Sequence, residues 1–140
     1  APNNHLAHYN LARTYGKVKH WMKAHKHYDL CVKVMPAYLD AYCNKAKIFI
    51  KQGLFDRAEH ECVKALSYRS NYPEAMSTLA LSLASQGRFH EAIPIYKSYL
   101  EFSPNDHKTR FNLAMSLLTT ENFEEGWQRY EDGILSGNVM

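Results

Sequence analysis

Histidines are the residues of this chain that most directly suggest metal chemistry, because eight of them occur in 140 residues. His5 and His8 are three residues apart, so they could share one face of a helix. His25 and His27 are two apart and would point in different directions. No carboxylate or cysteine joins either pair at the spacing of a His-Glu-x-x-His zinc motif. We therefore expect solvated histidines, no metal site and no cofactor.

Carboxylate pairs and cysteines are the other candidates for catalysis. Two carboxylate pairs fall on helices that we expect to face away from any pocket able to raise a carboxyl pKa; they are Glu59 with Glu61 and Glu124 with Glu125. Three cysteines form no Cys-x-x-Cys unit and cannot all pair with one another. We interpret them as reduced, which favours a cytoplasmic location, and we predict that the chain is not an enzyme.

Charge and hydropathy argue against two classes of partner. The formal net charge of +3 is too small to indicate nucleic-acid binding by itself. No apolar run approaches the ~18 residues that a membrane-spanning helix requires. With 46% apolar residues and no low-complexity stretch, the chain is typical of a folded globular protein.

The elements that position these residues follow a 34-residue period. Gln-Gly-Leu-Phe-Asp-Arg-Ala at 52–58 recurs as Gln-Gly-Arg-Phe-His-Glu-Ala at 86–92. Extending this frame gives four units, at 5–38, 39–72, 73–106 and 107–140. The eighth position of each unit is alanine, at Ala12, Ala46, Ala80 and Ala114. The period predicts two helices in each unit, the first over positions 2–14 and the second over positions 18–30.

The small and aromatic columns have a physical cause in helix packing. Alanine at positions 8 and 20 lets the two helices of a unit approach closely. Gly53 and Gly87 would end the first helix, where a residue with positive φ is favoured. Pro36 and Pro104 would stop the second helix, and Pro73 suits the first position of a new one. We therefore predict an all-α fold of antiparallel helix pairs.

These columns resemble the tetratricopeptide repeat family over essentially the full length. The resemblance implies a right-handed α-solenoid and a single domain at 1–140, with residues 1–4 as the tail of a preceding repeat. It also implies a protein–protein interaction scaffold that binds an extended peptide of another protein in its concave groove. Lys45 and Tyr99 depart from the family pattern, since position 7 is usually apolar and position 27 is usually small.

In this family the first helix of each pair lines the groove. Carried over position by position, the resemblance assigns to the groove Tyr9, Asn10, Arg13, Lys17, Cys43, Asn44, Lys47, Lys51, Thr78, Leu81, Lys108, Phe111, Asn112 and Met115. The sixth position reads Asn, Asn, Thr, Asn, which resembles the asparagine ladder of O-linked N-acetylglucosamine transferase. Such amides would pair with a peptide backbone, and the alternative is that they face water.

Charge is distributed unevenly along the repeats. The first unit has six Lys or Arg residues and one acidic residue, whereas the fourth has three and five. An acidic part of a partner would therefore lie near Arg13, Lys17, Lys47 and Lys51, and an apolar part near Leu81, Phe111 and Met115. We expect Cys43 to lie beside this peptide and to be accessible to a thiol reagent. The alternative is that these charges belong to ordinary solvated helix faces.

Other functions remain open from sequence. The string Phe-Glu-Glu-Gly-Trp at 123–127 resembles a variant that precedes glycosyltransferase domains in bacterial tetratricopeptide proteins, so a substrate-recruiting arm of such an enzyme is the alternative. Helical-repeat RNA binding is a third candidate, which the acidic second half opposes. The residue pattern does not match a clamp for C-terminal carboxylates. We also expect self-association through uncapped terminal helices.

Overall fold

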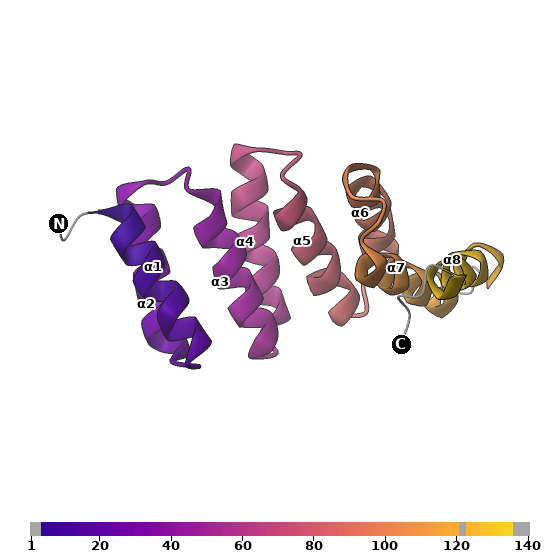
Figure 1. Ribbon diagram of the computed structural model, residues 1–140, viewed down its shortest axis with the longest axis horizontal. Coiled ribbons are helices and arrows are strands. Elements are labelled where there is room, and N and C mark those ends of the chain that lie inside the picture. The colour runs from indigo at the N-terminus through magenta and orange to yellow at the C-terminus, as the bar shows by residue number, and fades with distance from the viewer. Residues whose placement is uncertain (1–3, 121–122, 136–140) are drawn as a thin grey trace. The chain divides into compact units, whose positions relative to one another are not determined.

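The computed structural model describes residues 4–120 and 123–135, and these residues form eight α helices and no β strand (Figure 1). The helices are α1 (His5–Lys17), α2 (Trp21–Val34), α3 (Leu39–Lys51), α4 (Phe55–Tyr68), α5 (Pro73–Ser85), α6 (Phe89–Phe102), α7 (His107–Thr119) and α8 (Phe123–Leu135). The first helix of each pair begins at residue 5, 39, 73 or 107. The 34-residue frame and the predicted helix pairs are therefore confirmed.

In the first three helix pairs, the turn between the helices contains a residue in the left-handed conformation. Gly53 and Gly87 follow α3 and α5 with φ of 76° and 78°, as the sequence predicts. The corresponding position after α1 is Lys19, which has a φ of 63°. A side chain is disfavoured in this conformation, because its Cβ approaches the neighbouring carbonyl oxygen. The first turn therefore retains the conformation of the repeat without the glycine that suits it.

The chain divides into two compact units, residues 1–78 and 79–140. In the first unit, α1 packs on α2, and α3 packs on both α2 and α4. The core between them is built from small side chains that are fully buried, namely Ala12, Ala24, Ala41, Ala46 and Ala58. These residues allow the close helix contacts that the alanine columns predict.

A network of charges ties α3 to its neighbours in the first unit. The Nζ atom of Lys45 lies 2.5 Å from Asp29 Oδ1 on α2 and 3.9 Å from Glu61 Oε1 on α4. Glu61 is buried and also pairs with Lys64 at 3.3 Å. The expectation that Glu61 faces outward is wrong, because its carboxylate compensates a lysine that is itself mostly buried. This network explains why a lysine replaces the usual apolar residue of position 7.

The second unit is held by α7, which packs on both α6 and α8. Tyr96, Leu113 and Leu117 are its large fully buried side chains. Gly126 of α8 lies so close to α7 that a Cβ atom there would stand 2.9 Å from Cγ of Leu118. The aromatic at position 27 also has a local role, since Tyr99 donates a 2.6 Å hydrogen bond to Asp106, the residue that caps α7.

Candidate functional site

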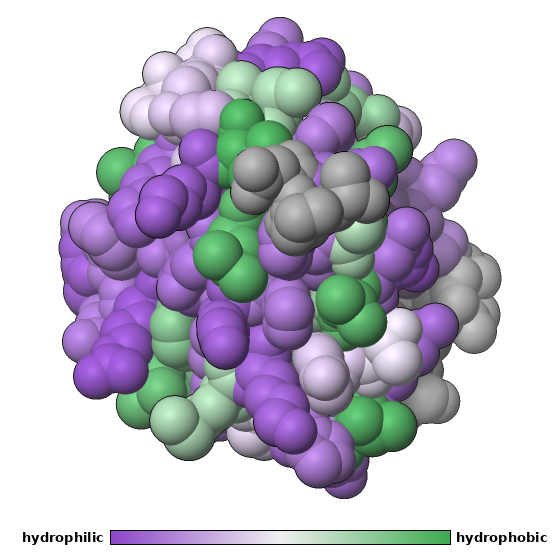
Figure 2. All heavy atoms as spheres, turned by 90° about the vertical axis from the view of Figure 1, so that its left-hand side faces the viewer, coloured by the Kyte–Doolittle hydropathy of each residue, from purple (hydrophilic) through white to green (hydrophobic). Residues whose placement is uncertain are grey.

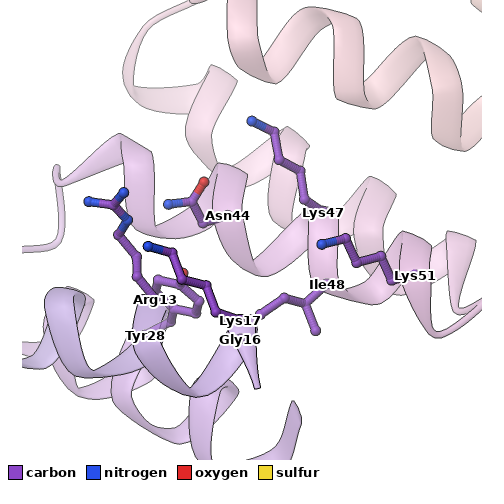
Figure 3. Close-up of a pocket in the computed structure, with 8 residues that line it drawn as sticks. All are labelled: Arg13, Gly16, Lys17, Tyr28, Asn44, Lys47, Ile48 and Lys51. Atoms are coloured by element: carbon purple, nitrogen blue, oxygen red, sulfur yellow. The ribbon is translucent and has the colours of Figure 1, made fainter. Parts of the chain in front are cut away.

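A hollow of about 190 Å³ lies in the first unit, between the facing sides of α1 and α3 (Figure 3). Eight residues line it: Arg13, Gly16, Lys17, Tyr28, Asn44, Lys47, Ile48 and Lys51. Five of them were predicted from the repeat frame as groove residues, namely Arg13, Lys17, Asn44, Lys47 and Lys51. The structure therefore brings together, around one opening, side chains that the sequence only relates by position.

Cations dominate the lining of this hollow. Arg13 and Lys17 stand one helical turn apart on α1, and Lys47 and Lys51 stand one turn apart on α3 (Figure 3). Lys47 Nζ lies 3.6 Å from a carboxylate oxygen of Glu74. In the part of the chain that the structure describes, the other three cations make no ion pair. The hollow is thus a concentrated positive site with little internal neutralisation.

Neutral polar groups form the floor of the site. Asn44 Nδ2 donates a 2.7 Å hydrogen bond to the hydroxyl of Tyr9. The Tyr9 ring packs edge-on against Tyr28 and Tyr38, with centroids 6.0 Å and 5.0 Å apart, and the Arg13 guanidinium lies 5.7 Å from its centroid. Burial raises the pKa of Tyr28 to about 12. These tyrosines therefore stay neutral and act as hydrogen-bond donors or acceptors at ordinary pH.

Close approach of the two helices sets the depth of the hollow. Gly16 of α1 faces α3, where a Cβ atom would stand 3.4 Å from Cδ1 of Ile48. Because glycine adds no side chain here, α1 can lie close to α3 at this point. Sequence reasoning missed Gly16, Ile48 and Tyr28 as lining residues. The signal for Gly16 was its place at position 12, which faces the groove in this family.

Cys43 does not lie in the groove as predicted. Its side chain is fully buried, in a cluster with Tyr42, Ala65 and Ala75. Burial, together with the nearby carboxylates of Glu74 and Asp40, raises the pKa of the thiol to about 12. The prediction of an accessible cysteine is wrong, because a short side chain at this position sinks between α3, α4 and the start of α5.

Thr78 is a second groove residue that the structure places elsewhere. Its side chain is buried, and its hydroxyl donates a 2.8 Å hydrogen bond to the carbonyl oxygen of Glu74, one turn earlier in α5. The hydroxyl therefore bonds to its own helix. Asn10 is exposed on α1. At the sixth position, then, the asparagines of the first two repeats are accessible and the threonine is not.

The remaining predicted groove residues belong to the second unit. Leu81, Asn112 and Met115 are half-buried, and Lys108 is exposed. The ring of Phe111 lies 6.1 Å from that of Tyr130 on α8. Phe111 is thus partly engaged within its own repeat.

The histidines are less solvated than the sequence suggests. His25 is half-buried, stacks on Phe49 with centroids 4.1 Å apart, and hydrogen-bonds to Gln52 at 2.8 Å. The expectation of a solvated side chain is wrong for His25. His8 and His27 stack with their Nδ1 atoms 3.3 Å apart. Over residues 4–120 and 123–135, no three His, Cys, Asp or Glu side chains gather as metal ligands would.

No helix among the described residues is long and apolar enough to cross a membrane. Seen from the N-terminal side, hydrophobic side chains are separated by hydrophilic ones (Figure 2). The exposed apolar residues of the first repeat include Leu6, Leu11 and Met22, of which Met22 is 87% exposed. Self-association through the first helix stays a prediction.

Paired antiparallel helices at a 34-residue step, with fully buried alanine at their contacts, define a tetratricopeptide repeat protein. The family model that matches, over residues 51–133, is of this repeat type and is described as anaphase-promoting complex, cyclosome, subunit 3. The chain belongs to this family of tetratricopeptide repeat proteins.

Solved structures share the fold at low sequence identity. YrrB, described as a tetratricopeptide protein with an unusual peptide-binding site, has 18% identity and a TM-score of 0.84, with 94% of this chain and 68% of that chain covered. MamA from Desulfovibrio magneticus RS-1 has 13% identity and a TM-score of 0.85, with 94% and 75% covered. The first such domain of Spaghetti (RPAP3), bound to an HSP90 peptide, has 20% identity and a TM-score of 0.81, with 86% and 98% covered. These matches show the all-α solenoid fold alone.

Proposed function

We propose that this chain is a protein-interaction scaffold and that its first two repeats bind an extended, acidic segment of a partner protein over the hollow between α1 and α3. The observation that carries the proposal is the set of four cations that line the hollow, Arg13, Lys17, Lys47 and Lys51. Among the described residues, Lys47 alone of the four makes an ion pair. Complementary charge of this kind orients a partner and accelerates its association.

A second observation supports contact with a peptide backbone. Asn44 donates an amide hydrogen to Tyr9 and also interacts with the hydroxyl of Tyr28, which leaves its carbonyl oxygen for a partner. Asn10 occupies the same position one repeat earlier and is exposed. The two side-chain amides could donate hydrogen bonds to a peptide backbone, or accept them from it, whatever the side chains of the bound peptide are. Each neutral bond of this type contributes ~0.5–1.5 kcal/mol net.

The proposal also includes the predicted groove residues of the second unit, residues 79–140. Leu81 on α5 and Phe111 and Met115 on α7 are half-buried apolar side chains, and α7 also carries the exposed Lys108 and the half-buried Asn112. We propose these residues as contacts for an apolar segment of a partner protein. The related fold fits this interpretation, since YrrB and the Spaghetti domain are both described as binding peptides.

Selection from a random peptide display library tests the proposal. The native chain should enrich acidic sequences, because the hollow offers three unpaired cations. A Lys17→Gln/Lys51→Gln variant should lose this enrichment. The matched control is Lys26→Gln/Lys33→Gln, which removes the same charge from exposed positions on α2.

Binding of one selected peptide should then be mapped by amide chemical shifts in NMR spectra. Shifts are expected on α1 and α3 around the hollow, and the affinity should fall as salt rises. The proposal would be contradicted if acidic peptides were not enriched over other peptides. It would also be contradicted if the enrichment were unchanged in the Lys17→Gln/Lys51→Gln variant.

A further inference from the structure

We propose that the hollow between α1 and α3 recognises a phosphoryl group on the partner segment, as carried by a phosphorylated serine, threonine or tyrosine. The inference rests on the proposed function, because it assumes that a partner segment lies over this hollow. It goes further by naming the chemical group that fits there, and it distinguishes this site from one that takes only a carboxylate.

The balance of charge is the first argument. Four cations line the hollow, and a single carboxylate, that of Glu74, approaches one of them at 3.6 Å. Both partners of that ion pair are about half exposed, so the pairing is weak. A carboxylate brings one negative charge, whereas a phosphate ester brings about 1.5 to 2 and three acceptor oxygens. A dianion therefore neutralises this site more completely than a single carboxylate does.

The placement of the cations is the second argument. Lys17 and Lys51 lie in the last turns of α1 and α3, where the helix dipole favours a positive charge. Arg13 and Lys47 each lie one turn earlier, where each repels the lysine that follows it. Their local contacts, Tyr9 for Arg13 and the half-exposed Glu74 for Lys47, offset this repulsion only in part. This repulsion lowers helix stability unless an anion sits between the charges. An anion bound over the hollow would relieve the repulsion in both helices at once.

The donors around the opening match the oxygens of a phosphoryl group. Arg13 presents a planar fork of N–H groups that can bond two oxygens at once. Lys17 adds a point charge from the same helix, and Lys47 and Lys51 add two from α3. Tyr28 and Asn44 supply neutral polar groups at the floor (Figure 3). Gly16 lines the hollow without a side chain, next to Ile48.

Aromatic packing favours a protein ligand over single-stranded RNA. Readers of single-stranded RNA stack bases on free aromatic faces. Tyr28, the aromatic residue that lines the hollow, is only 3% exposed. The Tyr9 ring is already in contact with Tyr28, Tyr38 and Arg13. The phosphate is thus expected on a side chain and not in a nucleic-acid backbone.

The test uses an acidic Glu/Gly peptide with one central residue in three forms: serine, phosphoserine and glutamate. Affinities are measured by calorimetry on the full chain at low and at physiological salt. The phosphoserine form should bind about tenfold more tightly than the serine form and more tightly than the glutamate form. In Lys17→Gln/Lys51→Gln this preference should shrink to about twofold or less. In the control Lys26→Gln/Lys33→Gln it should persist, and inorganic phosphate should compete with the phosphoserine peptide for the native chain.

Each alternative result has a distinct meaning. Equal affinity for all three peptides, or a preference that survives Lys17→Gln/Lys51→Gln, overturns the phosphoryl inference and leaves the peptide scaffold intact. Tighter binding of a single-stranded RNA than of the phosphoserine peptide also overturns the inference, in favour of nucleic acid. If no peptide form binds and library selection also yields none, the proposed function fails as well. Circular dichroism of each variant verifies that the helices are retained.

Discussion

The side-chain nitrogen of Asn44 lies 2.7 Å from the hydroxyl oxygen of Tyr9, although the two residues are 35 positions apart in the sequence. The bond joins α3 to α1 at the floor of the basic hollow. It also fixes the orientation of the Asn44 amide, so that its carbonyl is left for another partner. The hydrogen bond between Asn44 and Tyr9 therefore contributes to folding and also orients the Asn44 carbonyl for binding.

Replacing Asn44 by alanine tests this relationship. The change removes the bond to Tyr9 and should lower the free energy of unfolding by ~0.5–1.5 kcal/mol, measured by urea denaturation. Asn10→Ala is the matched control, because Asn10 holds the same repeat position but is exposed. It should change stability by less than ~0.5 kcal/mol. Equal losses in the two variants would show that the bond to Tyr9 contributes nothing measurable.

Replacing Lys19 by glycine should stabilise the fold. It has a φ of 63°, in a turn where the next two repeats have Gly53 and Gly87 at φ of 76° and 78°. Lys19→Gly relieves the contact of Cβ with the backbone, and we expect a gain of ~1 kcal/mol in stability. The reverse change, Gly53→Lys, should cost a similar amount. A thermal melt in which Lys19→Gly lowers the midpoint would contradict this account of the turn.

Native Cys43 should resist thiol reagents. Its side chain is fully buried and its pKa is raised to about 12, so the reactive thiolate is scarce at neutral pH. Cys31 and Cys62 are buried too, and burial raises the pKa of each thiol. Labelling with a chromogenic disulfide should report no thiol in the native chain and all three after unfolding. Rapid labelling of a single thiol under native conditions would show that one of these sites opens.

His25 should make the chain less stable in mild acid. Burial lowers the pKa of His25, and the nearby Lys45 lowers it further. Its Nε2 bonds to Gln52, while its Nδ1 is buried without a hydrogen-bond partner, so protonation would bury an unpaired N–H group. Below about pH 6.5 the unfolded chain takes up this proton more readily than the folded chain. Stability should therefore fall as the pH drops from there toward the lowered pKa of the folded state.

The variant His25→Phe isolates this effect. Phenylalanine keeps a ring against Phe49 and removes the titrating group. Urea denaturation at several pH values should show a smaller loss of stability in mild acid for His25→Phe than for the native chain. His27, whose pKa is lowered by burial and by His8, is present in both proteins and cancels in the comparison. Parallel pH profiles would exclude His25 as the source.

Fold and helix bounds were predictable because they depend on local and periodic signals. The buried alanines such as Ala46, and the positive φ of Gly53, follow from the repeat frame with little help from tertiary structure. The hollow was predictable in part, since Arg13 and Lys47 share one position of the repeat. Of the residues at its floor, Asn44 was predicted and Tyr28 was not, because Tyr28 belongs to a column that is read as core.

The errors have tertiary causes. Position in the repeat assigns Cys43 to the groove, but whether a short side chain reaches solvent depends on how α4 and α5 cover it. Lys45 looked like a departure from the family because its partners, Asp29 and Glu61, lie on two other helices. A periodic pattern predicts which face of its helix a side chain occupies, but it does not predict which charged residues of other helices lie next to that side chain.

The basic hollow belongs to no single repeat, since one helix supplies Arg13 and Lys17 and the corresponding helix of the next repeat supplies Lys47 and Lys51. Each repeat of a solenoid contacts only its neighbours, so a whole unit can be added while the other helices still pack in the same way. Insertion of one 34-residue unit between these two repeats would separate the pairs of cations while every helix still packed correctly. At this junction, therefore, selection for the site would act on repeat number and not only on residue identity.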